Sequence, residues 1–196
     1  MKYNCTVPFE YFSDPTDGTA GTNPYYADTW KSTVSASDGT NTGTFESASG
    51  VELNSKNAMT ITSSISYGAL GPNVASSNGI IDKDVAITNI GNVGLDAETK
   101  GDGAGLCTDY PGCAGSIIPH SNQKYVFVNN STAYASGTTL TGTLTTVLID
   151  TDKPTYASHP KAKSIYWGLK IPAGQAYGSY TGSNTINSIV SAPANW

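Results

Sequence analysis

Two histidines, His120 and His159, are the only imidazole groups in the chain, and each neighbours a proline in a stretch typical of a loop. Serine and aspartate are so abundant that some lie near any histidine, and no Gly-x-Ser-x-Gly motif marks a nucleophile for a Ser-His-Asp triad. The four glutamates have no context that distinguishes a pair suited to glycoside hydrolysis. We therefore predict no catalytic residues, with an enzyme of unrecognised class as the alternative.

Acidic residues gather at four places that could supply oxygen ligands to calcium. None of the four continues as the Asp-x-Asp-x-Asp-Gly loop of a calcium-binding hand. We expect these side chains to be solvated turn residues, with no metal and no cofactor, and calcium binding is the alternative. The four groups are Asp14/Asp17, Asp82/Asp84, Asp96/Glu98/Asp102 and Asp150/Asp152.

Two of the three cysteines, Cys107 and Cys113, bracket a short loop that contains a proline and a glycine. Their spacing is Cys-x5-Cys rather than the Cys-x2-Cys of many zinc sites. No second cysteine pair or nearby histidine would complete a zinc site. We predict a disulfide between them, which indicates an oxidising compartment, and a metal or redox pair is the alternative. The remaining Cys5 is a buried thiol, an intermolecular bridge, or the mark of a chain that begins inside a longer precursor.

Charge composition argues against two classes of partner. All ten basic residues are lysines, and fifteen acidic residues bring the formal net charge to −5. Nucleic-acid binding usually needs a basic stripe and arginines that read bases, and anionic membranes also attract basic segments. The apolar runs are far shorter than the roughly 20 residues of a membrane helix. We predict neither a nucleic-acid partner nor membrane insertion.

The polar composition favours an extracellular or cell-surface location. Serine and threonine make up roughly a quarter of the chain, a composition common in secreted all-β proteins. The first residues lack the features of a signal peptide, so we expect that a signal peptide was removed before this numbering begins, or that the protein is not secreted. Three sequons, at Asn4, Asn129 and Asn130, are candidate N-glycosylation sites, although chance also produces sequons in such a composition.

Period-two alternation of apolar and polar residues predicts strands along most of the chain. The clearest alternation runs from Met59 to Tyr67, and Gly91-Asn92 predicts a hairpin turn between two strands. No stripe with helical spacing stands out. The expected strands are Trp30–Ala36, Thr44–Ser47, Met59–Tyr67, Asp84–Asn89, Val93–Thr99, Tyr125–Val128, Thr139–Leu148, Ser164–Leu169 and Tyr177–Ile189.

About eight strands without interleaved helices predict an all-β fold, an antiparallel two-sheet β-sandwich of immunoglobulin-like type. An up-and-down barrel is the alternative. Residues 1–28 are aromatic yet rich in turn residues, so we expect an irregular N-terminal arm there and a single sandwich domain over residues 29–196.

Three stretches occur in a familiar order: Val85–Asn92 with the pattern Ile-x-Asn-x-Gly-Asn, Ser164–Pro172, and Ala173–Ile186 with Tyr-Thr-Gly-x-x-Thr-Ile. Together they resemble secreted β-sandwich modules of archaeal and bacterial cell-envelope proteins. The resemblance spans roughly residues 30 to 190. It implies a surface β-domain and supplies no catalytic motif.

These observations favour an extracellular structural protein, a subunit of a pilus-like filament or a surface layer. We expect its partner to be a second copy of itself, in a homopolymer with attached or bound glycans. The arm would add a strand to an open sheet edge of the next subunit, because strand addition satisfies a row of backbone donors and acceptors. The arm could instead pack on its own domain, and a carbohydrate-binding or adhesive module is the alternative function. The side chains expected to fill the partner's pockets are Tyr3, Val7, Phe9, Tyr11 and Phe12.

Overall fold

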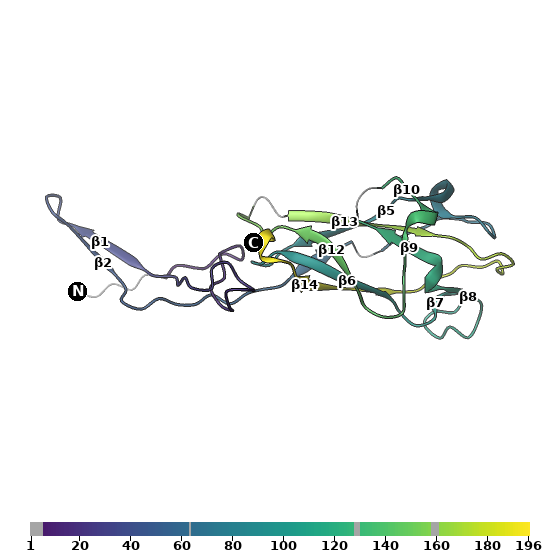
Figure 1. The fold of residues 1–196 in the computed structure, drawn as a ribbon, viewed down its shortest axis with the longest axis horizontal. Helices are drawn as coiled ribbons and strands as arrows, with labels where there is room; N and C mark the ends of the chain where they lie inside the picture. The colour runs from purple at the N-terminus through teal and green to yellow at the C-terminus, as the bar shows by residue number, and fades with distance from the viewer. Residues whose placement is uncertain (1–5, 63, 128–129, 158–160) are drawn as a thin grey trace.

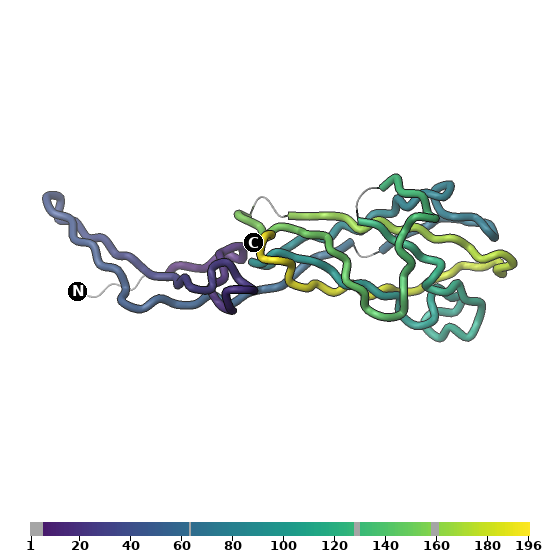
Figure 2. The backbone as a smooth tube through the Cα atoms, viewed as in Figure 1, coloured from purple at the N-terminus to yellow at the C-terminus, as the bar shows by residue number. Residues whose placement is uncertain are grey.

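The computed structural model describes residues 6–62, 64–127, 130–157 and 161–196. Its strands form several antiparallel sheets, which confirms the predicted all-β fold. The molecule is elongated, with a thin projection at one end and a thicker part that holds most of the strands (Figure 1). We call residues 6–57 the arm, a longer segment than the arm of residues 1–28 expected from the sequence, and we call residues 58–196 the body. The C-terminus lies where the two meet (Figure 2).

The body is built on two larger sheets. One has five strands in the order β11-β9-β13-β5-β3, and the other has three in the order β12-β6-β14. All their pairings are antiparallel. The bounds are β3 (Met59–Ile61), β5 (Lys83–Asn89), β6 (Leu95–Gly101), β9 (Gln123–Val126), β11 (Thr138–Thr139), β12 (Thr145–Thr151), β13 (Lys161–Leu169) and β14 (Asn184–Val190).

Three two-stranded sheets complete the pairing, and short 3-10 turns connect some of the strands. The sheets are β1 (Thr33–Ser37) with β2 (Thr42–Glu46), β4 (Ile80–Ile81) with β10 (Thr132–Ala133), and β7 (Gly105–Cys107) with β8 (Ile117–Pro119). The turns are η1 (Ser76–Gly79), η2 (His120–Asn122), η3 (Tyr134–Ser136) and η4 (Pro193–Asn195). Among the described residues no helix is long and apolar enough to cross a membrane.

The main hydrophobic core lies between the two larger sheets. Trp167 of β13 is fully buried and stacks at a tilt on Tyr125 of β9, with ring centroids 5.5 Å apart. The other core residues come from both sheets, because alternate side chains of each strand face inward. They are Val85, Ile87 and Ile165 from the five-stranded sheet, Leu95, Ala97, Val147 and Ile149 from the three-stranded sheet, and Leu140 between them.

The predicted hairpin at Gly91-Asn92 is wrong, because β5 and β6 belong to different sheets. The chain crosses from one sheet to the other here, and the fully buried Asn89 holds the crossing. Its Nδ2 donates to the carbonyls of Val93 (2.7 Å) and Asp152 (3.2 Å), and its Oδ1 accepts from the Gly91 N–H (2.9 Å). An asparagine two residues before a glycine thus satisfies the backbone of a crossover between sheets.

Three predicted strands are shorter in the structure or divided. Of Met59–Tyr67 only β3 pairs as a strand, because the chain then leaves the sheet while Ile65 and Tyr67 pack on the core. Thr139–Leu148 is divided between β11 and β12, which lie in different sheets. The last strand begins at Asn184 rather than at Tyr177. Alternation in Met59–Tyr67 therefore marks burial without marking backbone pairing.

Candidate interaction surface

The β1–β2 hairpin projects furthest from the body and touches no other sheet (Figures 1 and 2). Every residue of both strands is exposed. Val34 and Phe45 face each other across the two strands and are 56% and 70% exposed. A two-stranded hairpin by itself is at best marginally stable in water. Its apolar pair is therefore a surface suited to a partner.

The base of the arm is held by side-chain hydrogen bonds rather than by a large core. The buried Asn23 donates to the carbonyls of Pro15 (3.0 Å) and Asp17 (2.6 Å). Thr16, also buried, exchanges hydrogen bonds with the Leu53 backbone. These bonds bring residues 13–30 and 51–55 together at the base of the hairpin.

Lys153 joins the arm to the body. This lysine follows β12, is only 6% exposed, and its Nζ donates to the carboxylate of Asp14 and to the carbonyl of Phe12 (3.1 Å). Nζ also lies 5.8 Å from the centroid of the Tyr25 ring, within reach of a cation–π interaction. Burial, then the carboxylates of Asp14 and Asp28, raise the pKa of Tyr25. This junction fixes the base of the arm on the body.

The Ile-x-Asn-x-Gly-Asn pattern contributes a second attachment. Asn92 is buried, its Oδ1 accepts from the Lys56 N–H (2.6 Å), and its Nδ2 donates to the Asn54 carbonyl (3.1 Å). Gly91 lies so close to the Lys56 carbonyl that an added Cβ would be 2.0 Å from that oxygen. The motif therefore has a structural role: it ties the crossover between the sheets to the end of the arm.

At the opposite end of the body lies a groove, which we call the distal groove. It has a volume of about 640 Å³, and none of its lining residues carries a charge. Its floor belongs to a second hydrophobic cluster of the body, and the Tyr177 side chain at its rim is 93% exposed. The lining residues are Ile65–Leu70, Pro72, Leu106, Ile118, Leu169, Ile171 and Gln175–Gly182.

Tyr67 lies in the wall of the distal groove, and its hydroxyl donates to Oε1 of the buried Gln123 (3.2 Å). Burial raises the pKa of the Tyr67 phenol, and the neighbouring Tyr134 adds to this effect. Gln123 also exchanges hydrogen bonds with Asn184 of β14. This network fixes the groove wall to both larger sheets.

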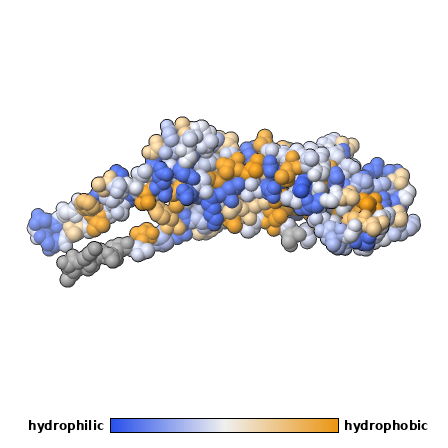
Figure 3. All heavy atoms as spheres, turned by 90° about the horizontal axis from the view of Figure 1, so that it is seen from below, coloured by the Kyte–Doolittle hydropathy of each residue, from blue (hydrophilic) through white to orange (hydrophobic). Residues whose placement is uncertain are grey.

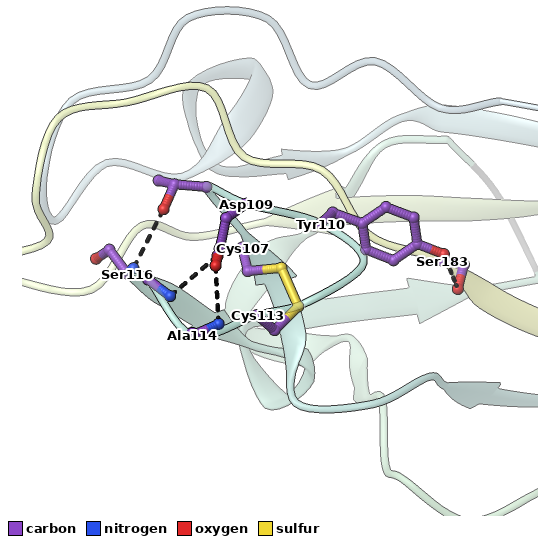
Figure 4. Close-up of a disulfide and its surroundings, with 9 residues drawn as sticks. Cys107, Asp109, Tyr110, Cys113, Ala114, Ser116 and Ser183 are labelled. Atoms are coloured by element: carbon purple, nitrogen blue, oxygen red, sulfur yellow. Dashed lines mark hydrogen bonds between the residues drawn. A yellow bond between two sulfur atoms is a disulfide. The ribbon is translucent and has the colours of Figure 1, made fainter.

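The disulfide between Cys107 and Cys113 closes the loop after β7. Inside this ring the Asp109 carboxylate accepts hydrogen bonds from the backbone N–H groups of Ala114 (2.9 Å) and Gly115 (3.0 Å), as Figure 4 shows. The Tyr110 hydroxyl donates to Ser183. The Asp109 carboxylate therefore binds the ring to the backbone that directly follows Cys113.

The predicted arm residues lie in different places. Val7 is 81% exposed, whereas Phe9 packs edge-on against Trp30 of the same chain at 5.3 Å. Tyr11 and Phe12 pack on each other and are partly buried. Phe9 and the Phe12 backbone thus contact other parts of their own chain, Trp30 and Lys153. Tyr3 lies outside the described residues.

Of the sequon asparagines, Asn130 is exposed in the loop after β9. Asn4 and Asn129 lie outside the described residues, as does Cys5.

Several of the acidic side chains singled out above accept hydrogen bonds from neighbouring groups of the fold. Asp96 accepts from the Asp150 N–H (2.8 Å), and Asp102 accepts from the hydroxyls of Ser183 (3.0 Å) and Thr185 (2.7 Å). Within the described residues no three His, Cys, Asp or Glu side chains come together as ligands for a metal ion.

His120 packs against Gly101 and Gly142, where an added Cβ would contact its ring. Its buried Nδ1 has no hydrogen-bond partner in the part of the chain that the structure describes. His159 lies outside that part.

Comparison of the chain with protein-family models, with curated proteins and with solved structures found no match. The geometry defines an elongated all-β chain with a projecting hairpin at one end and an uncharged groove at the other. Sequence reasoning missed both surfaces: it predicted strands for the hairpin but assigned them to the sandwich. The exposure of Val34 and Phe45 distinguishes the hairpin strands from strands of the sandwich, and a local sequence pattern does not reveal that exposure.

Proposed function

We propose that this chain is a structural subunit of an extracellular homopolymer, a pilus-like filament or surface layer built of immunoglobulin-like sandwich bodies. The observation that carries the proposal is the exposed apolar pair Val34 and Phe45 on an isolated hairpin. Burying a valine or phenylalanine side chain fully is worth about 1.5–3 kcal/mol. Contact with a second copy would supply that burial and add a further strand to a hairpin that joins no other sheet in the described part of the chain.

The mechanism that we propose is strand addition by β1 or β2. Within the described residues each of these strands pairs on one side only, so its other edge offers unpaired backbone groups to a second copy. The hairpin replaces residues 2–12 in this proposed role, because Phe9 packs against Trp30 and the Phe12 carbonyl accepts a hydrogen bond from Lys153.

A location outside the cell is part of the proposal. The Cys107–Cys113 disulfide supports it, because disulfides persist in oxidising compartments and are rare in the cytosol. The exposed side chain of Asn130 fits a glycan at that sequon.

A carbohydrate-binding or adhesive module is the second candidate. The distal groove favours it, because Tyr177 is exposed at the rim and the lining carries amide and hydroxyl groups without charge. Exposed aromatic faces with nearby neutral hydrogen-bonding groups suit neutral sugars. Retention of a neutral glycan by a monomer that never assembles would favour this candidate.

The test of the homopolymer is sedimentation velocity of the whole chain over a range of concentrations. We expect the native sequence to assemble as concentration rises and the double variant Val34→Ser/Phe45→Ser to remain monomeric. The matched control is Leu148→Ser/Val190→Ser, which removes two apolar side chains of similar exposure from the body. Equal assembly of both variants, or a native chain that is monomeric at every concentration, would contradict the proposal.

A further inference from the structure

A homopolymer needs an acceptor for the hairpin, and we propose that the acceptor is the distal groove of a second copy of this chain. This inference rests on the proposed function and adds the identity of the second surface. In it, β1 or β2 pairs with an open backbone segment along the groove wall, while Val34 and Phe45 enter the groove.

The open backbone segment is residues 64–70, which follow β3 and form one wall of the groove. Their backbone N–H groups donate no hydrogen bond to any other described residue. Ile65, Tyr67 and Leu70 pack toward the hydrophobic clusters of the body, so the segment is held in place by its side chains. Gly68 turns the chain with a φ of +71°, so residues 64–67 before it are the part of the segment that can act as a template for an added strand.

The length of the segment allows a short pairing. β1 and β2 have five residues each, whereas residues 64–67 are four, because the positive φ of Gly68 ends the run. At about 3.3 Å per residue, four residues span roughly 13 Å. The middle of one hairpin strand, where Val34 or Phe45 lies, can pair along this run.

The groove lining and the middle of the hairpin both carry no charge, so the middle is the part of the hairpin that suits the groove. No lining residue of the groove is charged. In the hairpin the charged side chains lie at the tip, Asp38, and at the base, where Lys31 pairs with Glu46 (3.1 Å). A charge moved into a partly enclosed groove would lose hydration without compensation. The uncharged pair Val34 and Phe45 is the part of the arm that the groove can accept.

The hairpin and the groove lie at opposite ends of an elongated molecule, so one chain cannot fill its own groove (Figures 1 and 2). Figure 3 shows hydrophobic atoms exposed on the projecting arm, along the middle of the body and again toward its far end. A contact between two different surfaces of identical subunits propagates from copy to copy and makes a ring or a filament. The placement of the surfaces at the two ends favours a linear filament.

The first test is photo-crosslinking in a mixture of unlabelled and 15N-labelled whole chains. Benzoylphenylalanine in place of Phe45 should crosslink to residues 64–72 or 172–182 of the other isotopic form. The control position is Thr44, which is adjacent in β2 and faces the opposite side of the hairpin. Benzoylphenylalanine at position 44 should give at least tenfold less of the crosslink to residues 64–72 or 172–182. Crosslinks from position 45 to another region of the second copy would overturn the groove assignment while leaving the homopolymer intact.

The second test places a charge in the groove. Ala176 lines the groove and is exposed, so Ala176→Glu should leave the fold intact and raise the concentration for half-assembly on the order of 100-fold. Ala173→Glu, three residues away and outside the lining, is the control and should change it less than threefold.

The failures of the two proposals are distinguishable. If Ala176→Glu assembles like the native chain while Val34→Ser/Phe45→Ser does not, the hairpin is needed but the groove is not its acceptor. If the native chain does not assemble, the homopolymer fails and the acceptor with it. A neutral oligosaccharide held by the monomer and lost in Ala176→Glu, with assembly unchanged, would assign the groove to a sugar and overturn the inference.

Discussion

Lys153 of the body donates a hydrogen bond to the carboxylate of Asp14 in the arm, although the two residues are 139 positions apart in the chain. Lys153 is buried, whereas the Asp14 side chain is 43% exposed. The pair orients the arm by binding it to the end of β12. A projecting element serves assembly only if its direction is fixed, so this junction is as important to the proposed function as the hairpin itself.

Replacement of this lysine tests the junction. We expect Lys153→Met to lower the free energy of unfolding by about 1–3 kcal/mol, because Asp14 and the Phe12 carbonyl lose a charged donor. Hydrogen exchange at residues 12–25 should quicken more than exchange in β13. The control is Lys31→Met, which removes an exposed ion pair with Glu46 and should cost no more than about 1 kcal/mol. Equal exchange in the two variants would show that Lys153 does not hold the arm.

A methyl group added to the crossover tests its close packing. Gly91→Ala would place a Cβ 2.0 Å from the Lys56 carbonyl oxygen, and we expect a loss of about 3 kcal/mol or more in urea unfolding. Gly43→Ala is the matched control, since nothing lies within 4 Å of its added Cβ. That variant should be neutral or more stable by up to about 1 kcal/mol. Similar midpoints for the two variants would contradict the crossover geometry.

Removal of the disulfide tests its contribution to stability. Closing a ring of seven residues restricts the unfolded chain by about 2 kcal/mol in the loop-entropy estimate. We expect Cys107→Ala/Cys113→Ala to lose that amount in urea unfolding. A reducing agent should lower the stability of the native chain by the same amount and leave the double variant unchanged. A reducing agent without effect on the native chain would show that the bond does not form.

Buried tyrosines predict a loss of stability at high pH. Burial raises the pKa of Tyr67 and Tyr125 above the ordinary value of 10.0. The free energy of unfolding should therefore be constant below about pH 10 and fall above it, because the unfolded state then releases protons that the folded state retains. Each such tyrosine contributes a slope of up to about 1.4 kcal/mol per pH unit.

Tyr67→Phe should make this decline shallower by the contribution of one tyrosine, although it also removes the hydrogen bond to Gln123. Urea unfolding between pH 8 and 11.5 measures both slopes. Identical slopes in the two chains would mean that the Tyr67 phenol is not protected by burial.

Composition and alternation were enough to predict the all-β class and the disulfide, because both depend on local features. The crossover after Asn89 could not be predicted locally, since one of its deciding hydrogen bonds reaches Asp152, 63 positions away. The hairpin shows a second limit. The alternation from Trp30 to Ala36 predicts a strand with an apolar face, but alternation does not reveal whether that face has a partner in the same chain.

The central claim is that this chain assembles with copies of itself, and electron microscopy tests it most directly. Negative staining of the purified whole chain over a range of concentrations should show regular filaments or sheets, which should disappear in Val34→Ser/Phe45→Ser. Separate elongated particles at every concentration, for the native chain as for the variant, would contradict the account.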